Sequence, residues 1–283
     1  MSTQVPLAIG SKDRNVAWYD PPLTSVEGPI RDLLENYSHV PADEVVSRVV
    51  EMRDKLWDVH PWPCVGQFRF TALSLRTQPS YPHILSRLQS SPTTERLLDV
   101  GCCLAPDLRK LAHDGAPSSC LVGLDTQAEF ITLGYDFFND RETFKGRFIH
   151  ADILDTTNEE VKNLEGGFGV VLLGMVLHIW DLEGQIRACE RVVQMLRPER
   201  GVMVVGQSVG SLVATEVVVR EGGKGIYKHD VESFGRMWEE VGRRTGTKWE
   251  VRARLDEGLG IAQGRRGWDE PSTRRLFFEV ERV

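Results

Sequence analysis

Residues 97 to 107 run from an apolar stretch through a glycine turn into a proline-led segment, Leu97-Leu98-Asp99-Val100-Gly101-Cys102-Cys103-Leu104-Ala105-Pro106-Asp107. This order predicts a buried strand, a tight turn and a helix that begins at Pro106. Ligands of open α/β sheets bind at the carboxyl ends of the strands, where such turns lie. Gly101 lets the backbone approach a ligand closely, and the carboxylate of Asp99 favours a cation nearby.

Apolar runs and amphipathic segments alternate on the carboxyl side of this turn. We expect parallel strands, buried on both faces, at residues 96–100, 120–124, 147–150, 168–174 and 202–205. Helices are expected at residues 106–113, 128–138, 182–196 and 231–244. Two half-exposed antiparallel strands are expected at residues 249–255 and 275–283, with loops at 221–225 and 256–272. The pattern predicts an α/β fold with a Rossmann-like, seven-stranded and mostly parallel sheet.

The first ninety residues are helical in pattern and rich in proline and tryptophan. Val45, Val49, Met52 and Leu56 keep the spacing of one helix face. We therefore expect an N-terminal helical cap over residues 1–90 and a cofactor-binding domain over residues 91–283. The aromatic residues of the cap either dock it on the core or form an apolar lid over a substrate.

The composition excludes several classes of protein. Of 283 residues, 41% are hydrophobic and 27% are charged, which is ordinary for a globular chain. The formal charge of −7 has the wrong sign for binding a nucleic-acid backbone. The five cysteines form no C-x-x-C pair, which argues against a zinc site or a disulfide framework. We find no secretory leader and no apolar run of about 18 residues, so we expect a soluble cytoplasmic protein without membrane insertion or a metal.

Three acidic residues lie at the ends of three successive predicted strands: Asp99, Asp125 and Asp152. At Asp125 a carboxylate can accept hydrogen bonds from both hydroxyls of a ribose. Asp152 could accept from an adenine amino group, and Ile153 could cover the face of the base. Asp125 and Asp152 could each instead be a helix cap. Only the first glycine of a dinucleotide fingerprint is present, so the turn suits a ligand that has a ribose and positive charge but no phosphate.

These residues resemble the class I S-adenosylmethionine-dependent methyltransferases over about residues 96–283. The turn Leu196-Arg197-Pro198-Glu199-Arg200-Gly201 also resembles the family, whereas Cys103 and Ala105 stand where the family often has glycine. The resemblance implies S-adenosylmethionine as the cofactor. The residues implied to bind it are Asp99, Gly101, Cys103, Asp125, Thr126, Asp152 and Ile153.

More narrowly, the chain is similar to the fungal meroterpenoid-pathway carboxyl methyltransferases. The similarity lies in Trp18-Tyr19-Asp20-Pro21-Pro22, residues 57–70, residues 99–107 and Val176-Leu177-His178-Ile179-Trp180. It implies a methyl ester formed on the carboxylate of a farnesylated aromatic polyketide, which is an apolar small-molecule substrate. It also implies a homodimer.

A carboxylate acceptor is already ionised at neutral pH and needs no general base, whereas a phenol usually does. His178 is the candidate base for a phenol, or else a structural histidine; His229 is a weaker candidate, and we expect His150 to be packed. We expect four residues to contact the substrate: Trp62, Trp180, Gln207 and Ser208.

A competing motif is Gly206-Gln207-Ser208-Val209-Gly210, which spells the G-x-S-x-G nucleophile elbow of α/β-hydrolases. In that interpretation Ser208 is the nucleophile and His229 the base, with Glu216 or Glu221 between them. Too little chain follows for the usual hydrolase elements. A binding module without catalytic activity is the third alternative.

Overall fold

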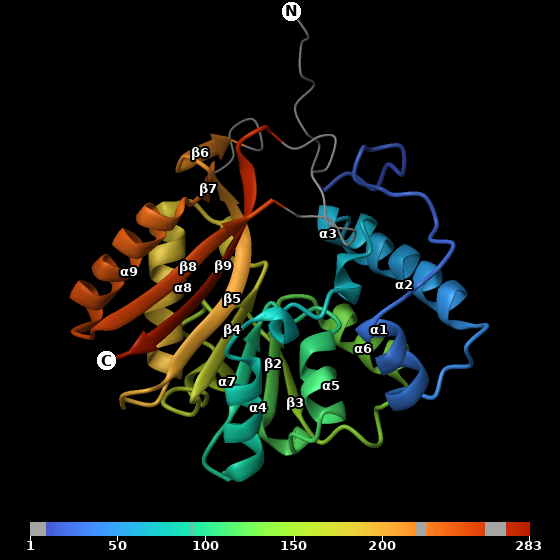
Figure 1. Cartoon of the computed structure of the whole chain (residues 1–283), viewed down its shortest axis with the longest axis horizontal. Helices are drawn as coiled ribbons and strands as arrows, with labels where there is room; N and C mark the ends of the chain where they lie inside the picture. The colour runs from blue at the N-terminus through green and yellow to red at the C-terminus, as the bar shows by residue number, and fades with distance from the viewer. Residues whose placement is uncertain (1–9, 92, 219–224, 258–269) are drawn as a thin grey trace, which may run out of the picture.

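The computed structural model describes residues 10–91, 93–218, 225–257 and 270–283. Its strands are β1 (Leu97–Val100), β2 (Leu121–Asp125), β3 (Arg147–His150), β4 (Val170–Gly174), β5 (Met203–Ser211), β6 (Thr215–Val218), β7 (Gly225–Lys228), β8 (Trp249–Asp256) and β9 (Thr273–Arg282). Seven of them form one sheet in the order β3-β2-β1-β4-β5-β9-β8 (Figure 1). β1 to β5 pair in parallel, and β9 and β8 pair antiparallel. The predicted Rossmann-like fold is confirmed.

The helices cover both faces and one end of this sheet. The α-helices are α1 (Pro29–Asp32), α2 (Val45–Val59), α3 (Pro63–Gly66), α4 (Tyr81–Ser90), α5 (Pro106–His113), α6 (Ala128–Phe138), α7 (Glu159–Lys162), α8 (Leu182–Met195) and α9 (Val231–Thr245). One short π-helix is η1 (Leu33–Tyr37). The short 3-10 helices are η2 (Arg69–Thr71), η3 (Leu75–Thr77), η4 (Ser118–Cys120) and η5 (Leu177–Ile179). None of the helices in the described part of the chain is long and apolar enough to cross a membrane.

α5 and α6 have the predicted limits, and at least one end of each carries a clear signal. Proline stands at the first position of α5, where its missing N–H costs nothing. α6 ends at Asn139, which adopts the left-handed conformation with φ 52°, as asparagine does more readily than most residues.

β5 is longer than predicted, because it ends at Ser211 rather than Val205. Its whole length pairs with β9, from Met203 opposite Glu281 to Ser211 opposite Thr273. The pentapeptide 206–210 is therefore extended strand and not a strand-to-helix turn. The nucleophile-elbow alternative for Ser208 is wrong.

The hairpin of β6 and β7 was not predicted from the sequence. β6 pairs antiparallel with β7, from Thr215 opposite Lys228 to Val218 opposite Gly225. Gly225, predicted to be loop, is the first residue of β7. Most of the two predicted loops, residues 221–224 and 258–269, lies outside the described residues.

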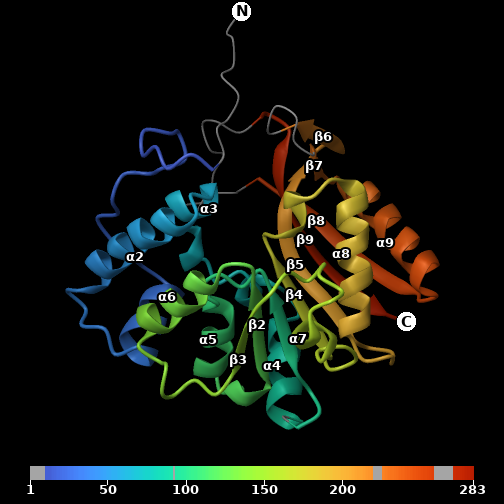
Figure 2. The same cartoon turned by 180° about the vertical axis from the view of Figure 1, so that it is seen from behind.

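Alternate residues of each strand point to opposite faces of the sheet. On one face Leu97, Leu121, Leu172, Met203 and Val205 pack with α4 and α5, and we call this the α4–α5 face. On the other face, residues that include Leu98, Leu173, Val204, Leu276 and Phe278 pack with α8 and α9, and we call this the α8–α9 face. α4 lies in front of the sheet in Figure 1 and α8 in front of it in Figure 2.

The N-terminal helices form their own apolar cluster, which packs against α6 (Figure 1). Arg53 is buried within the cap, where its guanidinium donates to the carbonyl of Asp20 at 2.7 Å. α4 belongs instead to the sheet, since its Tyr81, Ile84 and Leu88 pack on the α4–α5 face. Packing thus continues across the predicted boundary at residue 90.

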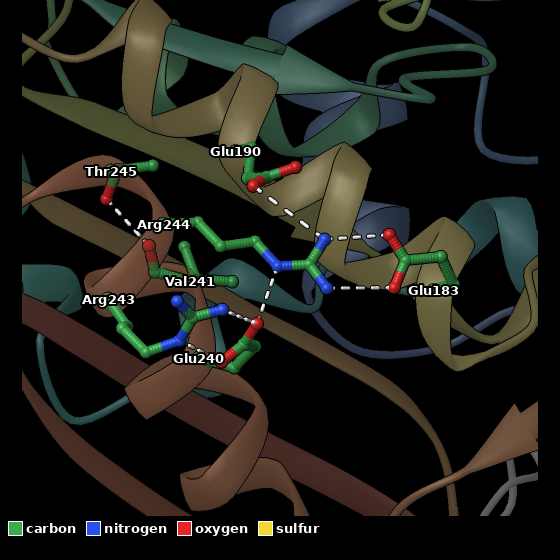
Figure 3. Close-up of polar contacts among 7 residues, drawn as sticks. All are labelled: Glu183, Glu190, Glu240, Val241, Arg243, Arg244 and Thr245. Carbon is green, nitrogen blue, oxygen red and sulfur yellow. Dashed lines mark hydrogen bonds and ion pairs between the residues drawn. The ribbon is translucent and has the colours of Figure 1, made fainter.

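An ion-pair network joins α8 to α9 on the surface (Figure 3). Arg244 of α9 donates to both carboxylate oxygens of Glu183 on α8, at 2.7 and 3.0 Å. Glu240 accepts from both Arg244 and Arg243. Exposed ion pairs contribute little individually, so this network orients two helices that are already held by the core.

Candidate functional site

The turn after β1 has a backbone that glycine adopts easily and other residues do not. Gly101 has φ 72°, Cys103 φ 52° and Ala105 φ 47°. The left-handed conformation costs a residue with a side chain about 1–2 kcal/mol. Cys103 and Ala105 thus adopt a backbone conformation typical of glycine, although neither residue is glycine.

Asp99 lies at the base of this turn, on the α4–α5 face. Its side chain is 4% exposed, and no hydrogen bond joins its carboxylate to any described residue. Burial raises the pKa of Asp99 well above its usual value, and the carboxylates of Asp107 and Asp125 raise it further. A buried carboxylate without a counter-charge is a site that favours a cationic ligand.

Asp125 ends β2 and holds the same turn. One carboxylate oxygen accepts from the N–H of Cys103 at 2.8 Å and the other from the N–H of Gln127 at 2.9 Å. Burial raises the pKa of Asp125, although these backbone hydrogen bonds lower it in part. Each oxygen keeps a second lone pair with which it could accept from a ribose hydroxyl.

Thr126 follows Asp125 and is exposed, and its carbonyl oxygen lies 3.1 Å from Nε2 of His150. Asp152 follows β3 and is also exposed. Its carboxylate accepts from the N–H of Leu154 at 2.9 Å, so it does stabilise a local turn. The side chain of Ile153 is 3% exposed and packs in the core of the α8–α9 face. Contact of Thr126, Asp152 and Ile153 with a cofactor stays a prediction.

Asp107 is an acidic residue of this region that sequence reasoning did not single out. Its carboxylate accepts from Ser74 Oγ at 2.8 Å and from the N–H of Leu75 at 3.0 Å. Burial raises its pKa to about 6. Its place in the first turn of α5 was visible in the sequence, but its partners lie more than thirty residues away and were not.

The residues around Gly101 fit S-adenosylmethionine. That compound carries positive charge on sulfur and on an amino group, and the buried, unpaired carboxylate of Asp99 would compensate it. Asp125, at the end of the neighbouring strand, suits its ribose. No group of three or more metal-ligating side chains occurs within the described ranges.

The ends of β4 and β5 lie beside this turn. A methyl group at Gly101 would approach Val176 to 3.1 Å, so the turns after β1 and β4 are in contact. Met175, directly after β4, has φ 62° and donates its N–H to the carbonyl of Gln207 at 2.7 Å. Backbone strain of this kind gathers at functional sites.

Gln207 and Ser208 are neighbours in β5 and therefore point to opposite faces of the sheet. Gln207 stands on the α4–α5 face with Asp99, whereas Ser208 stands on the α8–α9 face. Ser208 Oγ lies 3.3 Å from Nδ1 of His178, which belongs to η5. The structure thus brings Ser208 and His178 together and separates both side chains from Gln207.

The two tryptophans expected at the substrate lie in different parts of the molecule. Trp62 precedes α3 and packs against His60, with ring centroids 4.2 Å apart and planes tilted by 36°. Trp180 packs on the α8–α9 face, and its carbonyl accepts from the N–H of Tyr227 at 3.0 Å. His229 is 3% exposed, and burial lowers its pKa to about 4.

Comparison with known proteins identifies relatives along the whole chain. Residues 18–71 match the family model of the meroterpenoid methyltransferase N-terminal domain. The chain is 44% identical over 281 residues to O-methyltransferase atr3 of Stereocaulon alpinum. This match covers 98% of this chain and 80% of that protein. It is 38% identical over 300 residues to O-methyltransferase phiE of a fungal species, and the match covers 98% of this chain and 99% of that protein.

Among solved structures, an S-adenosylmethionine-dependent methyltransferase from Methanosarcina mazei matches with a TM-score of 0.50 and 14% identity. The match covers 72% of this chain and 98% of that one. At this identity the likeness shows the fold alone.

Proposed function

Because the chain belongs to the S-adenosylmethionine-dependent O-methyltransferases of the fungal meroterpenoid type, we propose that it methylates the carboxylate of a farnesylated aromatic polyketide. The product of this reaction is a methyl ester. Asp99 would hold the cationic end of the cofactor, Asp125 its ribose and Asp152 its adenine.

When bound, S-adenosylmethionine supplies a methyl group on a positively charged sulfur. The acceptor's carboxylate oxygen forms the new C–O bond as the C–S bond breaks, and the electron pair of that bond stays on sulfur. No proton moves in this step. The protein therefore has to hold the two reacting atoms in line and exclude water, which can supply much of the rate.

We propose a carboxylate as the methyl acceptor because of the residues on one face of the sheet. Among the described residues, β1, β4, β5 and β9 place Asp99, Gly174, Gln207, Phe277 and Arg275 on the α4–α5 face, but no histidine. A phenol, whose pKa is about 10, would require a base there, whereas a carboxylate, whose pKa is about 4, would not.

The alternative acceptor is a phenol, with His178 as the general base. The observation that favours it is the 3.3 Å contact with Ser208, which would orient the imidazole. In that case a proton must leave the phenol oxygen as the methyl group arrives, and His178 would take it.

The two acceptors are distinguished by the product and by one variant. We expect label from S-[methyl-³H]adenosylmethionine to enter a farnesylated 2,4-dihydroxybenzoic acid and to be released by mild alkali, which cleaves esters and not ethers. His178→Ala should keep most of this activity, as should His83→Ala, a control at an exposed position of α4. Alkali-stable label that is lost in His178→Ala alone would establish the phenol alternative.

We propose further that the enzyme is cytoplasmic and acts as a homodimer on this small-molecule substrate. Sedimentation equilibrium tests the dimer, and fractionation of the fungal cell tests the compartment.

A further inference from the structure

We propose that Gln207 and Arg275 bind the acceptor's carboxylate and so determine the specificity for an acid. The inference rests on the proposed function, since it assigns residues to the carboxylate named there. Gln207 was expected to contact the substrate, but the group that it would recognise was not assigned, and Arg275 was not singled out in the sequence.

Gln207 is the first observation. Its side chain is 3% exposed, and its Oε1 atom has no hydrogen-bond partner among the described residues. Leaving a buried amide unpaired costs about 1–3 kcal/mol, so the arrangement needs an explanation. A ligand that pairs with the amide would remove this cost. Either end of the amide could face the ligand, because a rotation of the side chain exchanges oxygen and nitrogen.

Arg275 supplies the positive charge on the same face. Gln207 lies directly opposite Phe277 in the β5–β9 ladder, and Val209 lies opposite Arg275. Gln207 and Arg275 are thus diagonal neighbours, about 7–8 Å apart at their backbones, which long side chains can span. The guanidinium of Arg275 lies 5.5 Å from the centre of the Phe277 ring.

The surroundings of this pair suit an aromatic acid. Phe277 is 4% exposed and Val209 9% exposed, so the surface between the polar groups is apolar. Arg254 also lies over the Phe277 ring, at 4.1 Å from its centre. Asp256 lies opposite Arg275 in the β8–β9 ladder and pairs with Arg254 at 3.7 Å, so one carboxylate stands with the two guanidinium groups beside this ring. The nearest acid of β9 on this face, Glu279, accepts from the N–H of Ser80 at 2.9 Å, away from the proposed site.

The position relative to the cofactor completes the argument. Gln207 lies opposite Gly174 of β4, and Asp99 lies opposite Leu172, two residues before Gly174. Two strand spacings, about 10 Å, therefore separate the strand of Asp99 from that of Gln207. Gly174 between them bears no side chain, and an added methyl group would meet only Ser74 Oγ, at 3.7 Å. Along this face Asp99 offers a carboxylate for a cation, and Gln207 and Arg275 offer groups for an anion, in the order that methyl transfer requires.

A matched pair of arginine variants tests this site. Arg274 and Arg275 are adjacent in β9 and point to opposite faces, so Arg275→Gln and Arg274→Gln make the same change on the two faces. The probes are farnesylated 2,4-dihydroxybenzoic acid and its neutral primary amide, titrated by calorimetry in the presence of S-adenosylhomocysteine. We expect the wild type to prefer the acid by about tenfold or more, which corresponds to about 1.4 kcal/mol.

Arg275→Gln should abolish this preference and raise KM for the acid, with a smaller change in kcat, whereas Arg274→Gln should retain it. Gln207→Glu, which is nearly isosteric and adds a negative charge, should weaken binding of the acid more than that of the amide. All variants should bind S-adenosylhomocysteine like the wild type, which shows that they are folded.

If Arg275→Gln and Arg274→Gln prefer the acid over the amide equally, the inference is overturned. The proposed function would still stand if the wild type forms the methyl ester. Failure of the wild type to form a methyl ester from the acid would overturn both.

Discussion

At the scale of single residues, the turn after β1 shows how a sequence can depart from a pattern and keep its geometry. Cys103 and Ala105 adopt the left-handed conformation that the family usually assigns to glycine. The strain is retained because Asp125 accepts the N–H of Cys103 and fixes the turn. The sequence identified the two departures, but only the structure shows that both residues adopt the left-handed conformation.

Asp99 leads to a prediction about protons. Its raised pKa means that the free protein tends to hold a proton there, and a cationic ligand favours the ionised form. Binding of S-adenosylmethionine should therefore release a proton, and affinity should increase with pH until Asp99 is ionised in the free protein. Calorimetry in two buffers of different ionisation enthalpy measures this release.

Asp99→Asn should bind the cofactor more weakly and release no proton at this site. Asp155→Asn changes an exposed carboxylate in the loop after β3 and should behave like the wild type. A heat of binding that does not depend on the buffer would contradict the role given to Asp99.

At the scale of elements, one carboxylate joins the helix after the first turn to the segment before α4. Asp107 in the first turn of α5 accepts from Ser74 and from the N–H of Leu75 in η3. These contacts hold η3 against the first turn of α5. The sequence predicted α5 with its limits, but gave no sign of this long-range pairing.

Asp107 should make stability depend on pH. Its pKa in the folded protein, about 6, is above the usual 3.8, so the folded state binds the proton more tightly than the unfolded state. The stability that this gives is present below about pH 4 and is lost as the pH rises through about 6. A difference of about two pKa units corresponds to about 3 kcal/mol.

Urea unfolding of the wild type and of Asp107→Asn checks this. The asparagine can keep both contacts but does not ionise, so the wild type should lose about 3 kcal/mol relative to the variant between about pH 4 and pH 7. Parallel pH profiles for the two proteins would show that Asp107 does not titrate in this range.

Elements with strong local signals were predicted well, and those set by tertiary pairing were not. α5, α6 and β3 have the predicted limits because proline, glycine, asparagine or an apolar run marks their ends. The continuation of β5 to Ser211 depends on its pairing with β9, some sixty residues later in the chain. Gly206 and Gly210 suggested a turn, but they are needed for close packing: a methyl group at Gly206 would lie 2.2 Å from the carbonyl oxygen of Leu173.

At the scale of the whole molecule, buried polar contacts connect the N-terminal cap to the sheet domain. Arg109 of α5 is 1% exposed and donates to both carboxylate oxygens of Asp140, at 2.8 and 3.0 Å. Tyr37 of the cap donates to the same carboxylate at 2.8 Å. Removing one member of a buried ion pair is costly, because the other charge is left buried without a partner. Cap and sheet are therefore joined at a fixed point beside α6.

The arrangement of charges over the sheet could not be predicted from the chain, because it depends on which face each residue of β5 and β9 occupies. The acids near the ends of β1 and β2, Asp99 and Asp125, were visible in the sequence as one end of a cofactor site. Gln207 and Ser208, in contrast, were expected to share one substrate, and the strand directs them to opposite faces.

A crystal structure with S-adenosylhomocysteine bound would test whether methyl transfer takes place on the α4–α5 face. We predict that the ribose hydroxyls contact Asp125, that the amino group lies near Asp99, and that the sulfur lies above Gly174 and faces Gln207. A nucleoside bound elsewhere, or a sulfur directed toward Ser208 and His178 on the α8–α9 face, would contradict this arrangement.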